Sequence, residues 1–233
     1  MLTDFEIQAI GLSLKVAFSS VTVSLPFAIV TAWLLARCQF IAKPLVDAIV
    51  HLPLVLPPVV IGYLLLISFS SGGTIGIFLK QTLNIDISFS WQGAALASAI
   101  VSFPLMVRAI RLSIENVDYH LEQAASTLGA NAIKVFLTIT LPLISPGILS
   151  GVILAFARSL GEFGATITFV SNIPEVTRTI PLAMYSFVQT PGAEFQALRL
   201  CIIATGIAFI ALIASYVLEQ KMHRSITNKA SVK

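Results

Sequence analysis

Charged residues are scarce in this sequence. Asp, Glu, Lys and Arg together make up 11% of its 233 residues, whereas 57% of the residues are hydrophobic. A soluble domain normally contains about 25% charged residues. Too little polar material remains to cover a surface that faces water on all sides. The composition therefore excludes an ordinary soluble domain and indicates an integral membrane protein.

Residues that bind metals or carry out catalysis are also few. The two cysteines, Cys38 and Cys201, form no CxxC pair, and the histidines at positions 51, 120 and 223 lack metal-ligand spacing. No Ser/His or paired-carboxylate constellation stands out among the apolar segments. We therefore expect no metal site and no catalytic residue. The net charge of +3 is interpreted as a sign of membrane orientation and not as a nucleic-acid surface.

Five long runs without Asp, Glu, Lys or Arg predict the fold. A transmembrane helix needs about 20 apolar residues to cross a hydrocarbon core about 30 Å thick. The runs are Val16–Ala36, Ala48–Leu79, Ile87–Val107, Val135–Ala157 and Leu200–Leu218. We interpret each run as one membrane helix. The sequence thus predicts an all-α polytopic bundle of about five transmembrane helices in a single domain, residues 1–233.

Two helix ends and one further apolar segment depart from the pattern of one membrane helix for each charge-free run. The second run exceeds one span, and we expect its helix to end at the cluster Ser70–Gly73. The fourth helix is expected to start near Pro142, because proline suits a first helical turn. The segment Phe163–Ala193 is apolar but contains three prolines. We interpret it as a partly embedded external segment, with a sixth span or a re-entrant segment as alternatives.

The distribution of basic residues predicts the orientation in the membrane. The N-terminus carries Asp4 and Glu6 but no Lys or Arg, unlike a cleavable signal peptide, so we expect no cleavage. Lys and Arg concentrate between the first and second helices, between the third and fourth helices, and in the tail, residues 220–233. The positive-inside rule then places the N-terminus outside and the tail in the cytoplasm.

The connection between the third and fourth helices, residues 115–142, has a helical pattern of its own. Leu121, Ala124, Ala125 and Leu128 recur at i, i+3, i+4 and i+7, which predicts a short amphipathic helix. Gly129 follows this apolar stripe, where a left-handed C-terminal cap is expected. A second short helix is predicted around Ile133, Phe136 and Leu137, before Pro142 restarts the membrane helix. Such a pair of helices either lies in the lipid headgroups or docks on a partner.

The same connection resembles a known motif. The segment EQAASTLGANAIKVFLTITLP is similar to the cytoplasmic loop of binding-protein-dependent ABC permeases, which reads Glu-Ala-Ala, three residues, Gly, nine residues, Ile-x-Leu-Pro. The matching residues are Ala124, Ala125, Gly129, Ile139, Leu141 and Pro142. Gln123 stands at the first motif position, and Glu122 precedes it, so either residue could make the polar contact of that position.

The resemblance implies a role for this loop. In that family the loop forms a coupling helix that docks on an ATPase subunit, so Leu121, Glu122, Gln123 and Leu128 join the motif residues as candidate coupling residues. The sequence contains no G-x-x-x-x-G-K-[ST] phosphate loop. ATP and Mg²⁺ are therefore expected on a separate ATPase, and no cofactor is expected on this chain, which we interpret as a non-catalytic pore subunit.

Three further stretches resemble the molybdate-permease branch of the family. They are HLPLVLPPVVIGYLLL, SFPLMVRAIRLSIENVD and LAFARSLGEFGATITFVSNIPEVTRTIPLAMYS. Sulfate and thiosulfate permeases share the general plan, and tungstate is not separated from molybdate by sequence. The resemblance implies a homodimer in the cytoplasmic membrane, with one ATPase under each copy and a molybdate-binding protein outside. An ATP-independent channel or transporter is the alternative, but it leaves the loop motif without a purpose.

Two segments are candidates for the translocation pathway or its gate. Arg158 and Glu162 stand at i, i+4 spacing near the outer end of the fourth helix, which allows a simple ion pair. Because ionisable groups at membrane depth face a bundle interior or a water-filled path, the alternative is that this stretch borders the pathway. The candidate residues there are Arg158, Ser159, Gly161, Glu162, Phe163 and Gly164. Pro57 and Pro58 predict a bend that either kinks a membrane helix or shapes a gate.

Overall fold

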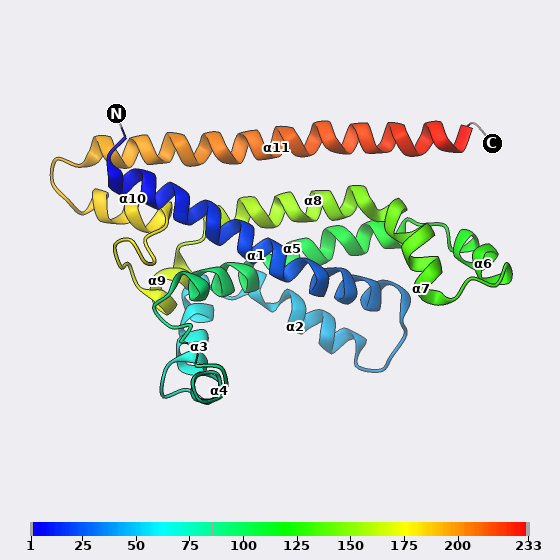
Figure 1. The fold of residues 1–233 in the computed structure, drawn as a ribbon, viewed down its shortest axis with the longest axis horizontal. Helices are drawn as coiled ribbons and strands as arrows, with labels where there is room; N and C mark the ends of the chain where they lie inside the picture. The colour runs from blue at the N-terminus through cyan, green and yellow to red at the C-terminus, as the bar shows by residue number, and fades with distance from the viewer. Residues whose placement is uncertain (1, 85, 232–233) are drawn as a thin grey trace.

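The computed structural model describes residues 2–84 and 86–231, with the backbone alone at residues 83, 215 and 219 and from residue 221 onward. The described residues form a bundle of helices and contain no strand (Figure 1). Within this described part of the chain, four helical runs are long and apolar enough to cross a membrane. They are α1 (Asp4–Arg37), α5 (Trp91–Glu115), the run that ends in α8 (Leu141–Leu160), and α11 (Glu194–Ser231).

The second predicted span is a bent pair of helices and not one helix. α2 (Lys43–Val55) and α3 (Pro58–Phe69) meet at 112°. Leu56 and Pro57 between them are extended, as expected of residues before a proline, and neither Pro57 nor Pro58 has an N–H to continue a helix. α3 ends at Phe69, as predicted, and α4 (Thr74–Leu83) follows. With this pair counted as one span, the predicted all-α bundle of about five membrane helices is confirmed.

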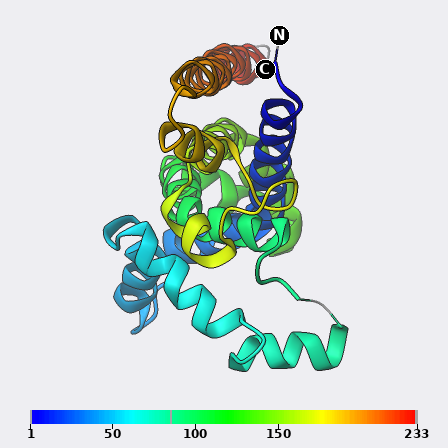
Figure 2. The ribbon, with the colours of Figure 1, turned by 90° about the vertical axis from the view of Figure 1, so that its left-hand side faces the viewer.

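The core of the bundle lies where α1, α5 and α8 pack together. Small and branched side chains from the three helices are fully buried there, among them Ala32, Leu35, Ile110, Ile144 and Ala155. Small residues allow the helix backbones to approach closely, which is how membrane helices gain packing energy. Figure 2 views the bundle along its long axis, with α2, α3 and α4 projecting to one side as an arm.

The apolar segment after α8 folds back onto the outside of this core. It contains α9 (Gly164–Val170) and α10 (Ile180–Val188), which pack against α3 and α5 and against α1 and α11, respectively. Helices of 7 and 9 residues reach only about 10 to 14 Å. Neither can cross a hydrocarbon core of about 30 Å. The alternative of a sixth continuous span in this segment is therefore wrong.

The two ends of the molecule are formed by different elements. The N-terminal end of α1 lies at the same end as α4, α9 and α10, whereas α6 lies at the opposite end, toward which the C-terminal end of α11 points (Figure 1). α11 has 38 residues and reaches about 57 Å, well beyond one hydrocarbon core. The backbone of the predicted tail from residue 220 to residue 231 therefore continues this helix. The basic side chains of the tail lie outside the described part of the chain.

Candidate functional site

The connection between α5 and α8 carries the predicted amphipathic helix, α6 (Tyr119–Thr127). Asp118 caps its N-terminus by accepting a hydrogen bond from the His120 N–H at 2.9 Å. Much of the apolar stripe is exposed: Leu121, which borders a hollow beside α5 and α8, is 48% exposed, and Leu128 is 89% exposed. Ala124 is exposed and Ala125 is partly exposed beside them. This arrangement is the reverse of an ordinary surface helix, whose apolar face turns inward.

The left-handed cap predicted at Gly129 is confirmed. Gly129 has φ +86°, a conformation that other residues rarely adopt. Its N–H bonds to the Ser126 carbonyl at 3.0 Å, and the Ala130 N–H bonds to the Ala125 carbonyl at 3.1 Å. This pair of bonds is the Schellman arrangement, which satisfies the last carbonyls of a helix. The turn fixes the direction in which the chain leaves α6.

Glu122 and Gln123 differ in their surroundings. The side chain of Glu122 is 12% exposed and turns inward, where its Oε1 accepts hydrogen bonds from Arg37 and Thr140. Gln123 is exposed. Gln123 therefore lies on the outer surface at the position where the motif has Glu, and Glu122 makes an internal contact instead.

The predicted second short helix is not separate from the membrane helix. α7 (Ala132–Val135), the π-helical turn η1 (Phe136–Thr140) and α8 form one continuous run. α8 begins at Leu141, near Pro142 as predicted, but it is not a separate start because η1 leads into it without a break. Pro142 has no N–H for the bond that a regular helix would make to Thr138, and the preceding Leu141 N–H bonds to the Phe136 carbonyl, five residues back. Ile139 and Leu141 are partly buried along this run, and Pro142 is exposed.

At the other end of α8, Arg158 and Glu162 form the expected ion pair. Arg158 Nη1 lies 2.8 Å from Glu162 Oε2, and the Glu162 side chain is 1% exposed. The second carboxylate oxygen, Oε1, accepts the Ala165 N–H at 2.8 Å at the start of α9. Ser159 is buried, with its hydroxyl 2.9 Å from that of Ser20. Glu162 thus joins the end of α8 to α9, and no part of it faces an open path within this chain.

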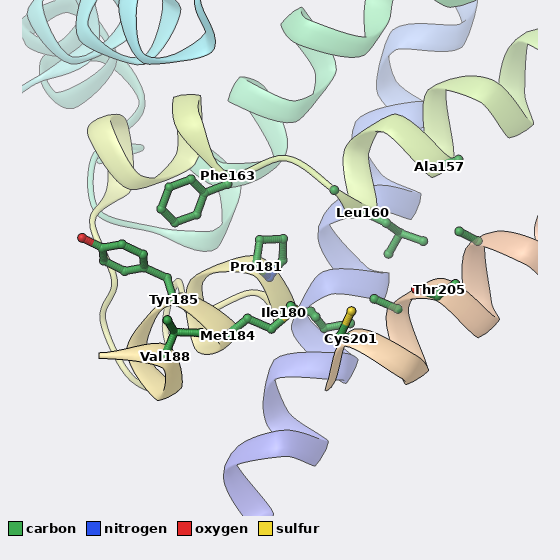
Figure 3. Close-up of a pocket in the computed structure, with 13 residues that line it drawn as sticks. Ala157, Leu160, Phe163, Ile180, Pro181, Met184, Tyr185, Val188, Cys201 and Thr205 are labelled. Atoms are coloured by element: carbon green, nitrogen blue, oxygen red, sulfur yellow. The ribbon is translucent and has the colours of Figure 1, made fainter. Parts of the chain in front are cut away.

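Gly161 and Phe163 line an apolar hollow of about 550 Å³ between α8, α10 and α11. Figure 3 shows the Phe163 ring close to Tyr185 of α10, and the two ring centroids lie 5.2 Å apart. Cys201 and Thr205 of α11 lie across the hollow from Leu160. An apolar lining does not suit a charged oxyanion, so this hollow is not a route for one.

The two predicted pathway segments meet each other. Gly164 lies against Pro58 and Val59 so closely that a Cβ added to Gly164 would come 2.9 Å from the Pro58 Cβ. The bend at Pro57 and Pro58 therefore rests on the start of α9, directly after Glu162. The sequence indicated both segments but could not show that they touch. A pathway role for either segment remains a prediction.

Sequence reasoning missed three participants in these contacts. The sequence indicates for Arg37 and Arg199 only a part in the count of basic residues that predicts orientation, and for Thr140 no role. Each contacts a carboxylate from a distant part of the chain: Arg37 and Thr140 contact Glu122, and Arg199 contacts Glu6. Apart from the rarity of charge in apolar segments, no local signal in the sequence marks such pairs.

Comparison with known proteins gives consistent results. The family model described as "Binding-protein-dependent transport system inner membrane component" matches residues 24–224. "Molybdenum transport system permease protein ModB" of Haemophilus influenzae is 61% identical, covering 95% of this chain and 96% of its own length. The protein of that name from Escherichia coli K12 is 63% identical, with 92% and 94% covered. "Sulfate transport system permease protein CysT" of Salmonella typhimurium is 36% identical, with 91% and 73% covered.

Solved structures show the same fold. A chain of the "bacterial alginate ABC transporter in complex with alginate pentasaccharide-bound periplasmic protein" superposes with a TM-score of 0.75. The match covers 94% of this chain and 80% of that chain at 18% sequence identity. At this identity the likeness concerns the arrangement of the helices and not the substrate.

Proposed function

Because this chain belongs to the family of binding-protein-dependent transport system inner membrane components, we propose that it is the pore-forming permease subunit of an ATP-driven ABC importer for molybdate. With its long apolar helices, the chain is a multi-pass protein of the inner membrane. We further propose that the N-terminus lies outside and that α6 and the C-terminal end of α11 lie in the cytoplasm.

The observation that carries the proposal is the outward apolar face of α6. Leu121 and Leu128 are exposed at the end of the bundle, whereas Glu122 of the same helix turns inward. A helix with exposed apolar residues on a polar end of a membrane protein is suited to insert into a groove of a partner. The partner we propose is an ATPase subunit that binds ATP and Mg²⁺, because this chain has no phosphate loop.

Molybdate is favoured over sulfate by sequence identity. The two molybdenum permeases are 61% and 63% identical to this chain, compared with 36% for the sulfate permease. The matches also cover 96% and 94% of the lengths of the two molybdenum permeases, compared with 73% of the sulfate permease. Tungstate, whose oxyanion has nearly the same shape, remains an alternative substrate.

The arm formed by α2, α3 and α4 supports the proposal of a homodimer. None of the residues of α2 is buried, and α3 exposes Val59, Tyr63, Leu64 and Ile67. A single copy has too few membrane helices to surround a path for a tetrahedral oxyanion. Two copies around a two-fold axis could cover these faces and enclose one path. Each copy would then place one α6 on one ATPase, with a molybdate-binding protein docked on the outer side.

The test is to purify the chain with its ATPase and to reconstitute the pair in liposomes with the external binding protein. We expect a stable complex and molybdate uptake that requires ATP. Uptake by the chain alone, driven by a gradient and unaffected by ATP, would indicate a channel or an ion-driven transporter. A chain that binds no ATPase would contradict the proposal.

A further inference from the structure

Two membrane helices converge on a single carboxylate of α6. The Glu122 Oε1 accepts a hydrogen bond from Arg37 Nη2 at 3.3 Å and another from the Thr140 hydroxyl at 2.7 Å. Arg37 is the last residue of α1, and Thr140 is the last residue of η1, directly before α8. Glu122 therefore connects α6 to both α1 and α8.

The π-helical turn gives Thr140 its position. η1 takes one extra residue into its turn, because the Leu141 N–H bonds to the Phe136 carbonyl. One residue corresponds to about 100° of rotation around a helix, so the turn sets which side chain faces α6. Thr140 is buried, with 1% of its surface exposed. Turns of this kind occur frequently at functional sites.

Arg37 contacts the entry to α6 as well as its centre. Its Nη2 also donates to the Val117 carbonyl at 3.1 Å, and its guanidinium lies 5.7 Å from the centre of the Tyr119 ring. One cation thus contacts three positions of the segment from Val117 to Glu122. A planar guanidinium with several donors is suited to this purpose.

Apolar packing does not hold α6 in place, because none of its residues is buried. Leu128 and about half of the Leu121 surface are exposed and are available to a partner. The polar contacts of Glu122 are consequently the main link between the helix and the membrane spans. Apart from the chain connections to α5 and α7, a displacement of α6 reaches α1 and α8 through this link, and the stiffness of the link decides how much of it is transmitted.

We propose that Arg37, Glu122 and Thr140 form a joint that makes α6 move as one body with α1 and α8. The three are positioning residues, and the inference rests on the proposed function, in which α6 docks on an ATPase. Without the joint, α6 still docks through its outward face and ATP hydrolysis continues. The movement of the ATPase then tilts α6 without moving α1 and α8, and less substrate crosses for each ATP hydrolysed.

The experiment uses the complete transporter in liposomes and measures molybdate transported per ATP hydrolysed. Glu122→Gln and Thr140→Val keep the size of each side chain while removing the charge or the hydroxyl. We expect both variants to bind the ATPase and to lower the ratio by roughly fivefold or more, within the usual range of coupling energies. Arg37→Gln combined with Glu122→Gln should be no worse than Glu122→Gln alone. Thr140→Ser, which retains the hydroxyl, should restore most of the ratio.

Arg111→Gln is the matched control, because Arg111 also forms ion pairs, with Asp47 and Glu115, but contacts no residue of α6. The amount of molybdate that this variant transports per ATP hydrolysed should stay close to that of the unaltered protein. If Glu122→Gln and Thr140→Val transport with an unchanged ratio, the joint does not exist. If Glu122→Gln fails to assemble, an unchanged ratio in Thr140→Val still overturns the inference. Absence of ATP-dependent uptake by the unaltered protein would instead refute the proposed function.

Discussion

Arg199 of α11 and Glu6 of α1 form an ion pair across 193 residues of sequence. Arg199 Nε lies 2.7 Å from Glu6 Oε1, and Nη2 lies 2.5 Å from Oε2. Glu6 is fully buried, and its Oε2 also accepts the Thr3 N–H at 2.7 Å. The carboxylate therefore fixes the start of α11 to the start of α1 and closes the capping box of α1.

Removal of the cation should destabilise the bundle. Arg199→Gln leaves the Glu6 carboxylate buried without a counter-charge, and breaking a buried pair in this way costs roughly 3–5 kcal/mol. We expect a clear fall in the midpoint of thermal unfolding in detergent. The double variant Glu6→Gln/Arg199→Gln, whose amides can bond to each other, should recover most of the loss. Equal losses in the single and double variants would show that the charge pair itself is not what stabilises α11.

Loss of the apolar face of α6 should uncouple the transporter without unfolding it. Leu128 is 89% exposed, so Leu128→Asp removes no packing in the free chain. A carboxylate at this position must lose its hydration when α6 enters an apolar groove, which is costly. We expect normal membrane insertion, weaker binding of the ATPase and little uptake. Ile41→Asp, at a fully exposed residue between α1 and α2, should leave uptake unchanged.

Gly129→Val tests the same helix through its backbone. A Cβ at Gly129 would meet no atom within 4 Å, so the cost arises from φ +86° and not from crowding. For a residue with a side chain this conformation costs about 1–2 kcal/mol, and the cost is larger for a β-branched residue. The end of α6 should shift and uptake should fall. Near-normal uptake in both Leu128→Asp and Gly129→Val would contradict the role assigned to α6.

Orientation can be measured with single cysteines. In a background with Cys38→Ala and Cys201→Ala, Asp4→Cys and Asp86→Cys should react with a membrane-impermeant thiol reagent applied to spheroplasts. Ile41→Cys, at the opposite end of α1, should react only after the membrane is permeabilised. Position 225 should behave like position 41. The reverse pattern would invert the proposed topology and place α6 outside, where no ATPase could reach it.

The sequence predicted the elements whose signal is local. Charge-free runs of about 20 residues identified α1, α5, α8 and α11, because the thickness of the membrane sets their length. The stripe from Leu121 to Leu128 and the glycine after it identified α6 and its cap, because helical periodicity and a C-terminal glycine are also local signals. Pro57 and Pro58 marked the position of a bend, but not an angle of 112°, which depends on how α3 packs against α9.

Contacts between distant residues could not be predicted from one sequence. Glu122 meets an arginine 85 residues away, and a hydropathy pattern does not indicate that they touch. The sequence does not indicate the π-helical turn, because a proline at position 142 is typical of the first turn of a new helix. Proline instead changed the hydrogen-bond register of a helix that was already under way. Phe163–Ala193 was ambiguous because short buried helices and a membrane span have similar compositions.

The last prediction is that this subunit does not select the anion. Tight recognition of an oxyanion needs several converging hydrogen-bond donors. Arg158 is the cation near the outer end of α8, and Glu162 already neutralises it at 2.8 Å. The hollow beside Gly161 and Phe163 is apolar. A tight site in the path would also slow release, since transport requires that the cargo leaves again. Selection should therefore reside in the external binding protein.

The test is a chimeric binding protein that keeps the native docking surface but carries a sulfate-specific pocket. With the unaltered permease and ATPase in liposomes, we expect ATP-dependent uptake of sulfate at a rate close to that of molybdate with the native binding protein. Stimulation of ATP hydrolysis by the chimera is the control for docking. If the chimera stimulates hydrolysis and sulfate still does not enter, the path through the permease itself discriminates between the two anions. Donors from a second copy of the chain would then have to complete a selective site that one copy does not contain.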